Sequence, residues 1–122
     1  MRSGPFHSFR AGALDQAMML KAKAVFTPSA DDRIIQSWDT ASKADEANDF
    51  SVCTTWLVRE RSAWLVNVSR AKLEFPELRR RIVTEARRFD AKLVLIEEAG
   101  SGLQLLQEFR QSGQIAAKGM KP

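Results

Sequence analysis

Short apolar and β-branched runs, separated by polar turns, make up the pattern of the chain from residue 33 onwards. Residues 34–41, 50–59 and 63–68 are each of strand length and rich in Val, Ile, Trp, Phe and Thr, which suit a pleated surface. Arg61 and Ser62 form a short polar turn between the second and third runs. Two such runs joined by a turn predict a β-hairpin, although no Asn-Gly pair fixes the turn type.

The pattern changes to a helical period after Pro76. Proline suits the first turn of a helix, because its missing N–H has no partner there. Leu78, Ile82, Ala86 and Phe89 recur at helical spacing and form one apolar stripe. This segment is therefore expected to form an amphipathic helix that packs on a sheet.

A further strand and helix follow. Residues 92–96 form a compact apolar run, which favours a central strand covered on both faces. Ser101 is placed to cap the next helix, and Gly113 gives that helix a C-terminal stop. Residues 115–117 begin one more strand, which the end of the chain at Pro122 is expected to cut short. The order β-β-β-α-β-α predicts an α/β fold: a mixed sheet with helices packed on it and its last elements truncated.

Residues 1–32 differ from the rest of the chain. Gly, Ser and Pro mark both ends of this segment, and residues 14–25 between them are a modest helical candidate. The segment carries no recognisable motif. We interpret it as a linker or a non-homologous N-terminal segment, which leaves residues 33–122 as a partial domain.

Composition narrows the chemistry. The 122 residues suffice for one small domain, and no apolar run approaches the ~20 residues that span a bilayer, so no membrane partner is expected. Cys53 is the single cysteine and His7 the single histidine. A single cysteine fits a reducing cytoplasm. One cysteine and one histidine cannot build a His/Cys zinc site within the chain. Any bound metal would be held by carboxylates, which favour hard ions such as Mg²⁺ or Mn²⁺.

The net charge of +4 is mildly basic and unevenly distributed. A ten-residue stretch of the first predicted helix contains five arginines: Arg79, Arg80, Arg81, Arg87 and Arg88. Such a cluster is compatible with a polyanionic partner such as DNA. The alternative is an ordinary solvated helix face.

Two acidic residues follow predicted strands directly. Asp39 ends the run 34–38, and Glu97 ends the run 93–96. If these strands are neighbours, the two carboxylates meet, and their repulsion is relieved by a divalent cation or by protonation of one of them. Two-metal nucleases use such clusters to hold ions about 4 Å apart. The alternative is that both acids only mark where strands reach solvent.

The chain is similar to the nuclease domain of phage terminase large subunits over roughly residues 33–122. The similarity rests on ordered blocks, each weak alone but fairly specific as a set: IQSWDTA at 35–41, NDFSV at 48–52, VSR at 68–70, LEFPEL at 73–78, VLIEEAGSG at 94–102 and LQE at 106–108.

This resemblance implies an RNase H-like fold that cuts double-stranded DNA with Mg²⁺ or Mn²⁺ in a two-metal arrangement. It makes Asp39 the first metal ligand and Glu97 the second, both catalytic. Glu98 would point to the other side of a regular strand, so it is expected to support the site or to act as a backup ligand. Asp49 matches a recurrent acid and is expected to assist.

The basic residues expected to contact DNA lie in two segments. Arg70 and Lys72 are placed to reach phosphates beside the acidic pair, although a solvated strand end explains them as well. Arg80 and Arg87 belong to the basic helix. A sheet that lacks its last strand also leaves an edge open, which predicts a homodimer through that edge.

Terminases pair this domain with an upstream ATPase motor, a small terminase subunit and a portal, and they act in the cytoplasm of the bacterial host. The chain has no Gly-Lys-Ser/Thr phosphate loop, so it is not the motor. The family also uses a third acid, an aspartate beyond the position where this sequence stops. The site is therefore expected to be deficient as it stands. Two alternatives stay open: a non-catalytic DNA- or protein-binding remnant, and another RNase H-like nuclease of the resolvase or transposase type.

Overall fold

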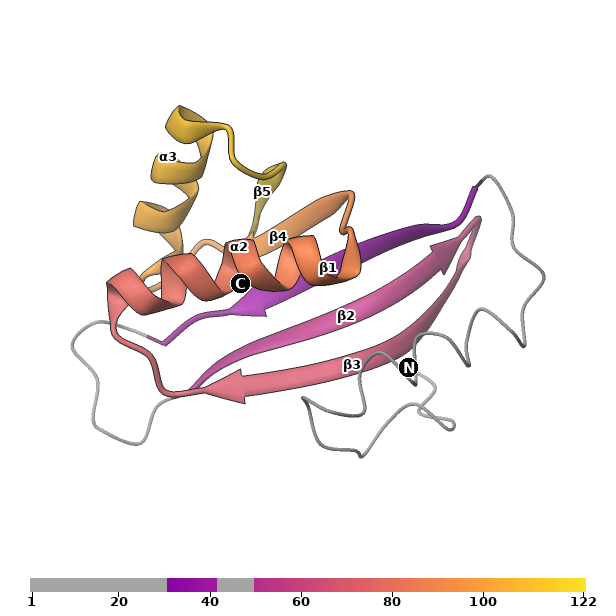
Figure 1. Cartoon of the computed structure of the whole chain (residues 1–122), viewed down its shortest axis with the longest axis horizontal. Coiled ribbons are helices and arrows are strands. Elements are labelled where there is room, and N and C mark those ends of the chain that lie inside the picture. The colour runs from indigo at the N-terminus through magenta and orange to yellow at the C-terminus, as the bar shows by residue number, and fades with distance from the viewer. Residues whose placement is uncertain (1–30, 42–49) are drawn as a thin grey trace.

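Five strands form one mixed sheet in the computed structural model, which describes residues 31–41 and 50–122 (Figure 1). The helix expected over residues 14–25 and the segment 42–49 lie outside the described residues. The strands are β1 (Arg33–Asp39), β2 (Ser51–Arg59), β3 (Ser62–Ala71), β4 (Leu93–Glu97) and β5 (Ala117–Met120).

The strands lie in the order β3-β2-β1-β4-β5, so that β1 is central. β2 pairs antiparallel with β1 and with β3, whereas β4 pairs parallel with β1 and with β5. The predicted mixed sheet is confirmed. The last strand, expected to be cut short, is formed over four residues and pairs along β4.

Two helices pack on one face of this sheet. Helix α2 (Phe75–Phe89) has Pro76 in its first turn, and helix α3 (Gly102–Ser112) ends at Gly113, whose φ of 68° is the left-handed conformation that glycine adopts without strain. Apolar residues of both helices form one buried cluster with the sheet residues Trp38, Cys53 and Ile96. The predicted apolar stripe of α2 is therefore confirmed as its buried face.

Alternate residues of the strands point to the opposite side of the sheet, because side chains alternate along a strand. Within residues 31–41 and 50–122, no helix packs on this side. We call it the open face. Its residues include Ile35, Asp39, Val52, Arg70, Leu95 and Glu97.

A polar contact joins the sheet to α2 within the otherwise apolar layer between them. The Gln36 Nε2 amide donates to the Thr55 hydroxyl at 3.1 Å and to the backbone carbonyl of Glu85, in α2, at 3.0 Å. Cys53 lies beside this contact and is fully buried, as expected of a small apolar side chain. Burial is the main cause that raises the pKa of its thiol, so the thiol stays neutral.

Two local predictions are wrong. Ser101 does not cap α3: its own backbone is already helical, at φ −70° and ψ −14°, whereas a capping residue needs extended backbone to reach the first N–H groups. The hairpin turn lies at Glu60 and Arg61, one residue earlier than expected, and Glu60 takes a positive φ of 51°. None of the helices in the described part of the chain is long and apolar enough to cross a membrane.

Candidate functional site

The ends of β1 and β4 bring two carboxylates together. Trp38 and Ile96 are register partners in the parallel pair, and Asp39 and Glu97 are the next residue of each strand. Parallel strands end at the same edge of a sheet, so both acids reach that edge side by side on the open face. The strand-terminal acids were expected to meet in this way if the two strands were neighbours.

Electrostatics show how close the two carboxylates are. A hydrogen bond with Asp39 is the main cause that raises the pKa of Glu97, and the negative charge of Asp39 adds to it. Two carboxylates can hydrogen-bond only when one of them holds a proton. A positive charge beside the pair would relieve the repulsion that contributes to this raised pKa.

The backbone beyond Asp39 is held on both sides by hydroxyl groups. The Ala41 N–H donates to the Ser51 hydroxyl at 3.0 Å, at the start of β2. The Ser101 hydroxyl donates to the Ala41 carbonyl at 2.9 Å, at the start of α3. Ser101 thus fixes the exit of β1 in place of capping its own helix. These two bonds hold the end of the strand that carries Asp39.

The backbone at Glu97 is held by a tight connection from β4 into α3. The Ala99 N–H donates to the Glu97 carbonyl at 2.8 Å, and the Gly102 N–H donates to the Ala99 carbonyl at 2.9 Å. Gly102 lies so close to the Glu97 carbonyl that a Cβ atom there would overlap it. Glycine at position 102 is therefore a packing requirement of the strand end that presents Glu97.

Glu98 is separated from the acidic pair. Its backbone N–H donates to the Met120 carbonyl at 2.7 Å, which extends the pairing of β4 with β5. Its carboxylate lies against Gly119, the register partner of Ile96, and thus on the side of the sheet that the helices cover. A role for Glu98 as a backup ligand in the same site would require its side chain to change sides.

The sheet also separates the two groups of basic residues that were expected to contact DNA. Arg70 is the partner of Val52, which is the partner of Asp39, so Arg70 lies on the open face. Lys72 lies near Arg70, since both cations lie over the ring of Phe50. Arg80 and Arg87 are exposed on α2, on the other side of the sheet.

The donor chemistry of the pair fits a hard divalent ion. Carboxylate oxygens are the ligands that Mg²⁺ and Mn²⁺ prefer, and a cation would relieve the repulsion between Asp39 and Glu97. Across the described ranges, no group of three or more acidic, His or Cys side chains is placed to hold a metal. Asp49, expected to assist, lies outside the described residues. The described residues thus supply two candidate ligands.

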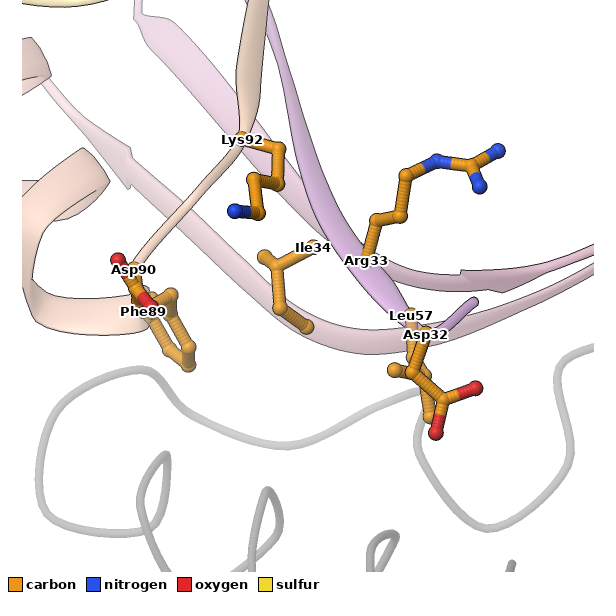
Figure 2. A pocket seen from close by; sticks show the side chains of 7 residues that line it. All are labelled: Asp32, Arg33, Ile34, Leu57, Phe89, Asp90 and Lys92. Atoms are coloured by element: carbon orange, nitrogen blue, oxygen red, sulfur yellow. The ribbon is translucent and has the colours of Figure 1, made fainter. Parts of the chain in front are cut away.

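A hollow of about 120 Å³ lies at the opposite end of β1 (Figure 2). Ile34, Leu57 and Phe89 give it apolar walls, and Asp32 and Lys92 lie at its rim. The Asp32 carboxylate accepts a hydrogen bond from Arg59 Nε at 2.6 Å. Because the first residues of β1 line this hollow and Asp39 is the last residue of β1, the hollow belongs to a different end of the sheet from the acidic pair.

Replacing Asp39 with asparagine is expected to stabilise the metal-free protein at neutral pH. The raised pKa of Glu97 means that the folded state holds its proton more tightly than the unfolded chain, whose ordinary value is 4.5. Stability is therefore lost as pH rises from 4.5 through the raised pKa, and the penalty is complete above both values. Thermal unfolding in EDTA should show a higher Tm for Asp39→Asn at about pH 7, with the gain disappearing below the ordinary pKa of 4.5. Glu98→Gln is the control, and a gain independent of pH would contradict this explanation.

Comparisons with known proteins bear on the fold. No protein-family model matches the chain, and no curated protein is similar to it in sequence. Two solved structures resemble it at 12% identity each: a large terminase from a thermophilic bacteriophage, with a TM-score of 0.57, and T. thermophilus RuvC in complex with a Holliday junction substrate, with a TM-score of 0.53. The terminase match covers 79% of this chain and 25% of the terminase, and the RuvC match covers 73% of this chain and 66% of RuvC.

The chain has an RNase H-like fold. Its five-stranded mixed sheet and two helices agree with both neighbours, at an identity that establishes the fold alone. The fold expected from the sequence is thereby confirmed. The chain spans only a quarter of the terminase and about two thirds of RuvC, so it corresponds to one part of the larger protein in each case.

Proposed function

We propose that this chain is a metal-dependent nuclease domain that cuts DNA, with Asp39 and Glu97 as its metal-binding carboxylates. One observation carries the proposal: the two acids meet at the ends of adjacent parallel strands, on the open face of an RNase H-like sheet. Adjacent carboxylates on a rigid sheet edge are costly unless a cation neutralises them. The two solved neighbours are a phage large terminase and RuvC in complex with a Holliday junction substrate, which favours DNA as the substrate.

The chain's own residues have distinct roles in this proposal. Asp39 and Glu97 bind and orient the metal ion. The hydroxyls of Ser51 and Ser101 keep the end of the strand that carries Asp39 in place through Ala41. A bound Mg²⁺ or Mn²⁺ would lower the pKa of a coordinated water and stabilise the leaving oxygen. Arg70 and Lys72, on the acidic side of the sheet, would hold the phosphate backbone.

Double-stranded DNA is the substrate that we propose, as part of phage DNA packaging in the cytoplasm of a bacterial host. In that setting the domain would work with an ATPase domain, a small terminase subunit and a portal. The terminase neighbour supports this setting, because the chain resembles one part of a large terminase in structure. Pairing of two copies through the edge at β5 stays a prediction.

A non-catalytic DNA-binding domain is the second candidate. It is favoured by the absence of a third metal-binding side chain among residues 31–41 and 50–122. A nuclease of the resolvase or transposase type is a further alternative, and the RuvC neighbour supports it. The non-catalytic candidate predicts salt-sensitive DNA binding without a metal requirement.

Nicking of supercoiled plasmid tests the proposal. The purified chain, shown by circular dichroism to be folded, is incubated with plasmid in Mn²⁺, in Mg²⁺ and in EDTA. We expect open-circular product with either ion and none in EDTA, because the acidic pair alone has no group to activate water. DNA binding without any nicking in either ion would support the non-catalytic candidate instead. A four-way junction substrate, compared with a linear duplex, separates the resolvase alternative.

A further inference from the structure

We infer that Phe50, Arg70 and Lys72 form a second binding subsite on the open face, which takes an unpaired nucleotide of a nucleic-acid strand. Phe50 would stack on the base, and the two cations would bind the flanking phosphates. We call these three residues the aromatic-cationic subsite. The inference deepens the proposed function and rests on it, because it names the part of the substrate that lies beside the acidic pair.

The ring of Phe50 is exposed and is flanked by two positive charges. Phe50 is 37% exposed, and among the described residues only one other large apolar side chain, Leu103 on α3, is as exposed. The Arg70 guanidinium lies 4.3 Å from the ring centroid, and the Lys72 ammonium lies 5.3 Å from it. Both cations lie over the ring, so a base would stack on the part of the ring that stays exposed. An aromatic ring beside cations is the combination that single-strand binding proteins use for a base and its phosphates.

Strand register places the subsite on the same side of the sheet as the acidic pair. Asp39 pairs with Val52, and Val52 pairs with Arg70, so the three form one row across β1, β2 and β3. Neighbouring strands are ~4.8 Å apart, so about 10 Å of sheet separates Asp39 from Arg70. At a rise of ~3.4 Å per nucleotide, that distance corresponds to roughly three nucleotides. A strand held at Phe50 thus reaches the acidic pair within a short stretch.

Stacking selects for an unpaired base. In a duplex both faces of each base are already covered by neighbouring bases, so no face is open to a side chain. An extruded or single-stranded base offers its face, and stacking on an aromatic ring is tolerant of sequence because every base has a π-face. The charge of Arg70 and Lys72 complements the phosphates on either side of that base. Within the proposed double-stranded substrate the subsite would therefore take a base from a locally opened stretch, and the same contact should let the chain bind free single strands.

Binding to a short single-stranded oligonucleotide that carries 2-aminopurine tests the inference. The measurement is made in EDTA, where the acidic pair does not cleave, so it is independent of nuclease activity. We expect anisotropy to show roughly 5- to 100-fold weaker binding for Phe50→Ala, together with loss of the quenching that stacking causes. Phe50→Trp should retain both, and Phe50→Leu, which keeps the apolar bulk without the ring, should behave like Phe50→Ala.

Leu103→Ala is the matched control, since it removes an exposed apolar side chain on the helical layer and should leave binding unchanged. Arg70→Gln should reduce the slope of the logarithm of the binding constant against the logarithm of the salt concentration by about one. Equal single-strand affinities for the wild type and Phe50→Ala would overturn the inference, as would an equal loss of affinity for a duplex of the same length. Phe50-dependent binding by a chain that nicks no plasmid would support the inference while the nuclease proposal fails.

Discussion

Substituting Asp39 with asparagine is expected to reduce metal-dependent nicking of supercoiled plasmid on the order of 100- to 1,000-fold, as is typical when a group that supports developing charge is removed. Asparagine keeps the size of the side chain and one of its oxygens, but it removes the negative charge that a hard cation requires. Asp39 is exposed and its strand end is held by backbone contacts at Ala41, so the fold should persist. The measurement is the rate of open-circular product in Mn²⁺, with circular dichroism as the check on folding.

Glu98→Gln is the matched control for this loss. Glu98 is the next residue after Glu97 but lies against Gly119, away from the acidic pair. Its neutralisation should change nicking by less than about threefold, a difference of under ~1 kcal/mol in the barrier. Equal losses in Asp39→Asn and Glu98→Gln would mean that the general charge of this edge matters, and would count against a site built on Asp39 and Glu97.

Gly102→Ala is expected to be the most damaging small substitution near the acidic pair. The added methyl group would overlap the Glu97 carbonyl and approach Ile96 Cγ2 to 3.2 Å. Backbone cannot rotate out of the way as a flexible side chain does, so the start of α3 or the end of β4 must shift. Overpacking of this kind costs about 1–3 kcal/mol, and each kcal/mol lowers the Tm of a small domain by roughly 4–8 °C.

Because the shift falls on Glu97, nicking should also fall in the Gly102→Ala protein that remains folded. Gly113→Ala is the comparison. It places a side chain at a φ of 68° but in open space, so it should lower the Tm through backbone strain without changing the rate per folded molecule. If Gly102→Ala and Gly113→Ala lose stability alike and nick equally well, the tight connection does not position Glu97.

The apolar pattern of the chain predicted the order of strands and helices, because strand-length runs and a helical stripe differ in length and spacing. The first two runs of strand length form β1 and β2, and the apolar stripe of α2 is its buried face. The meeting of Asp39 and Glu97 followed from two strand ends and from the assumption that the strands are neighbours. The register confirms that assumption.

The remaining features depend on contacts between distant parts of the chain. The hydroxyl of Ser101 bonds to a carbonyl sixty positions earlier, so local capping rules could not predict its partner. Arg70 and Arg80 look alike in the sequence, yet the sheet places them on opposite sides. The role that we propose for Phe50 depends on Arg70 in β3 and Lys72 just beyond it, so the residues around Phe50 alone do not predict it.

The contact between Gln36 and the carbonyl of Glu85 determines how α2 is aligned along the sheet. A hydrogen bond tolerates little displacement of its two atoms, and a buried amide that leaves its acceptor loses stability. The bond from Gln36 Nε2 to this carbonyl therefore helps to hold α2 in place against β1. Gln36 and Asp39 belong to the same strand, three residues apart. The buried polar residue of β1 therefore helps to fix where the helical layer lies relative to the edge that carries the acids.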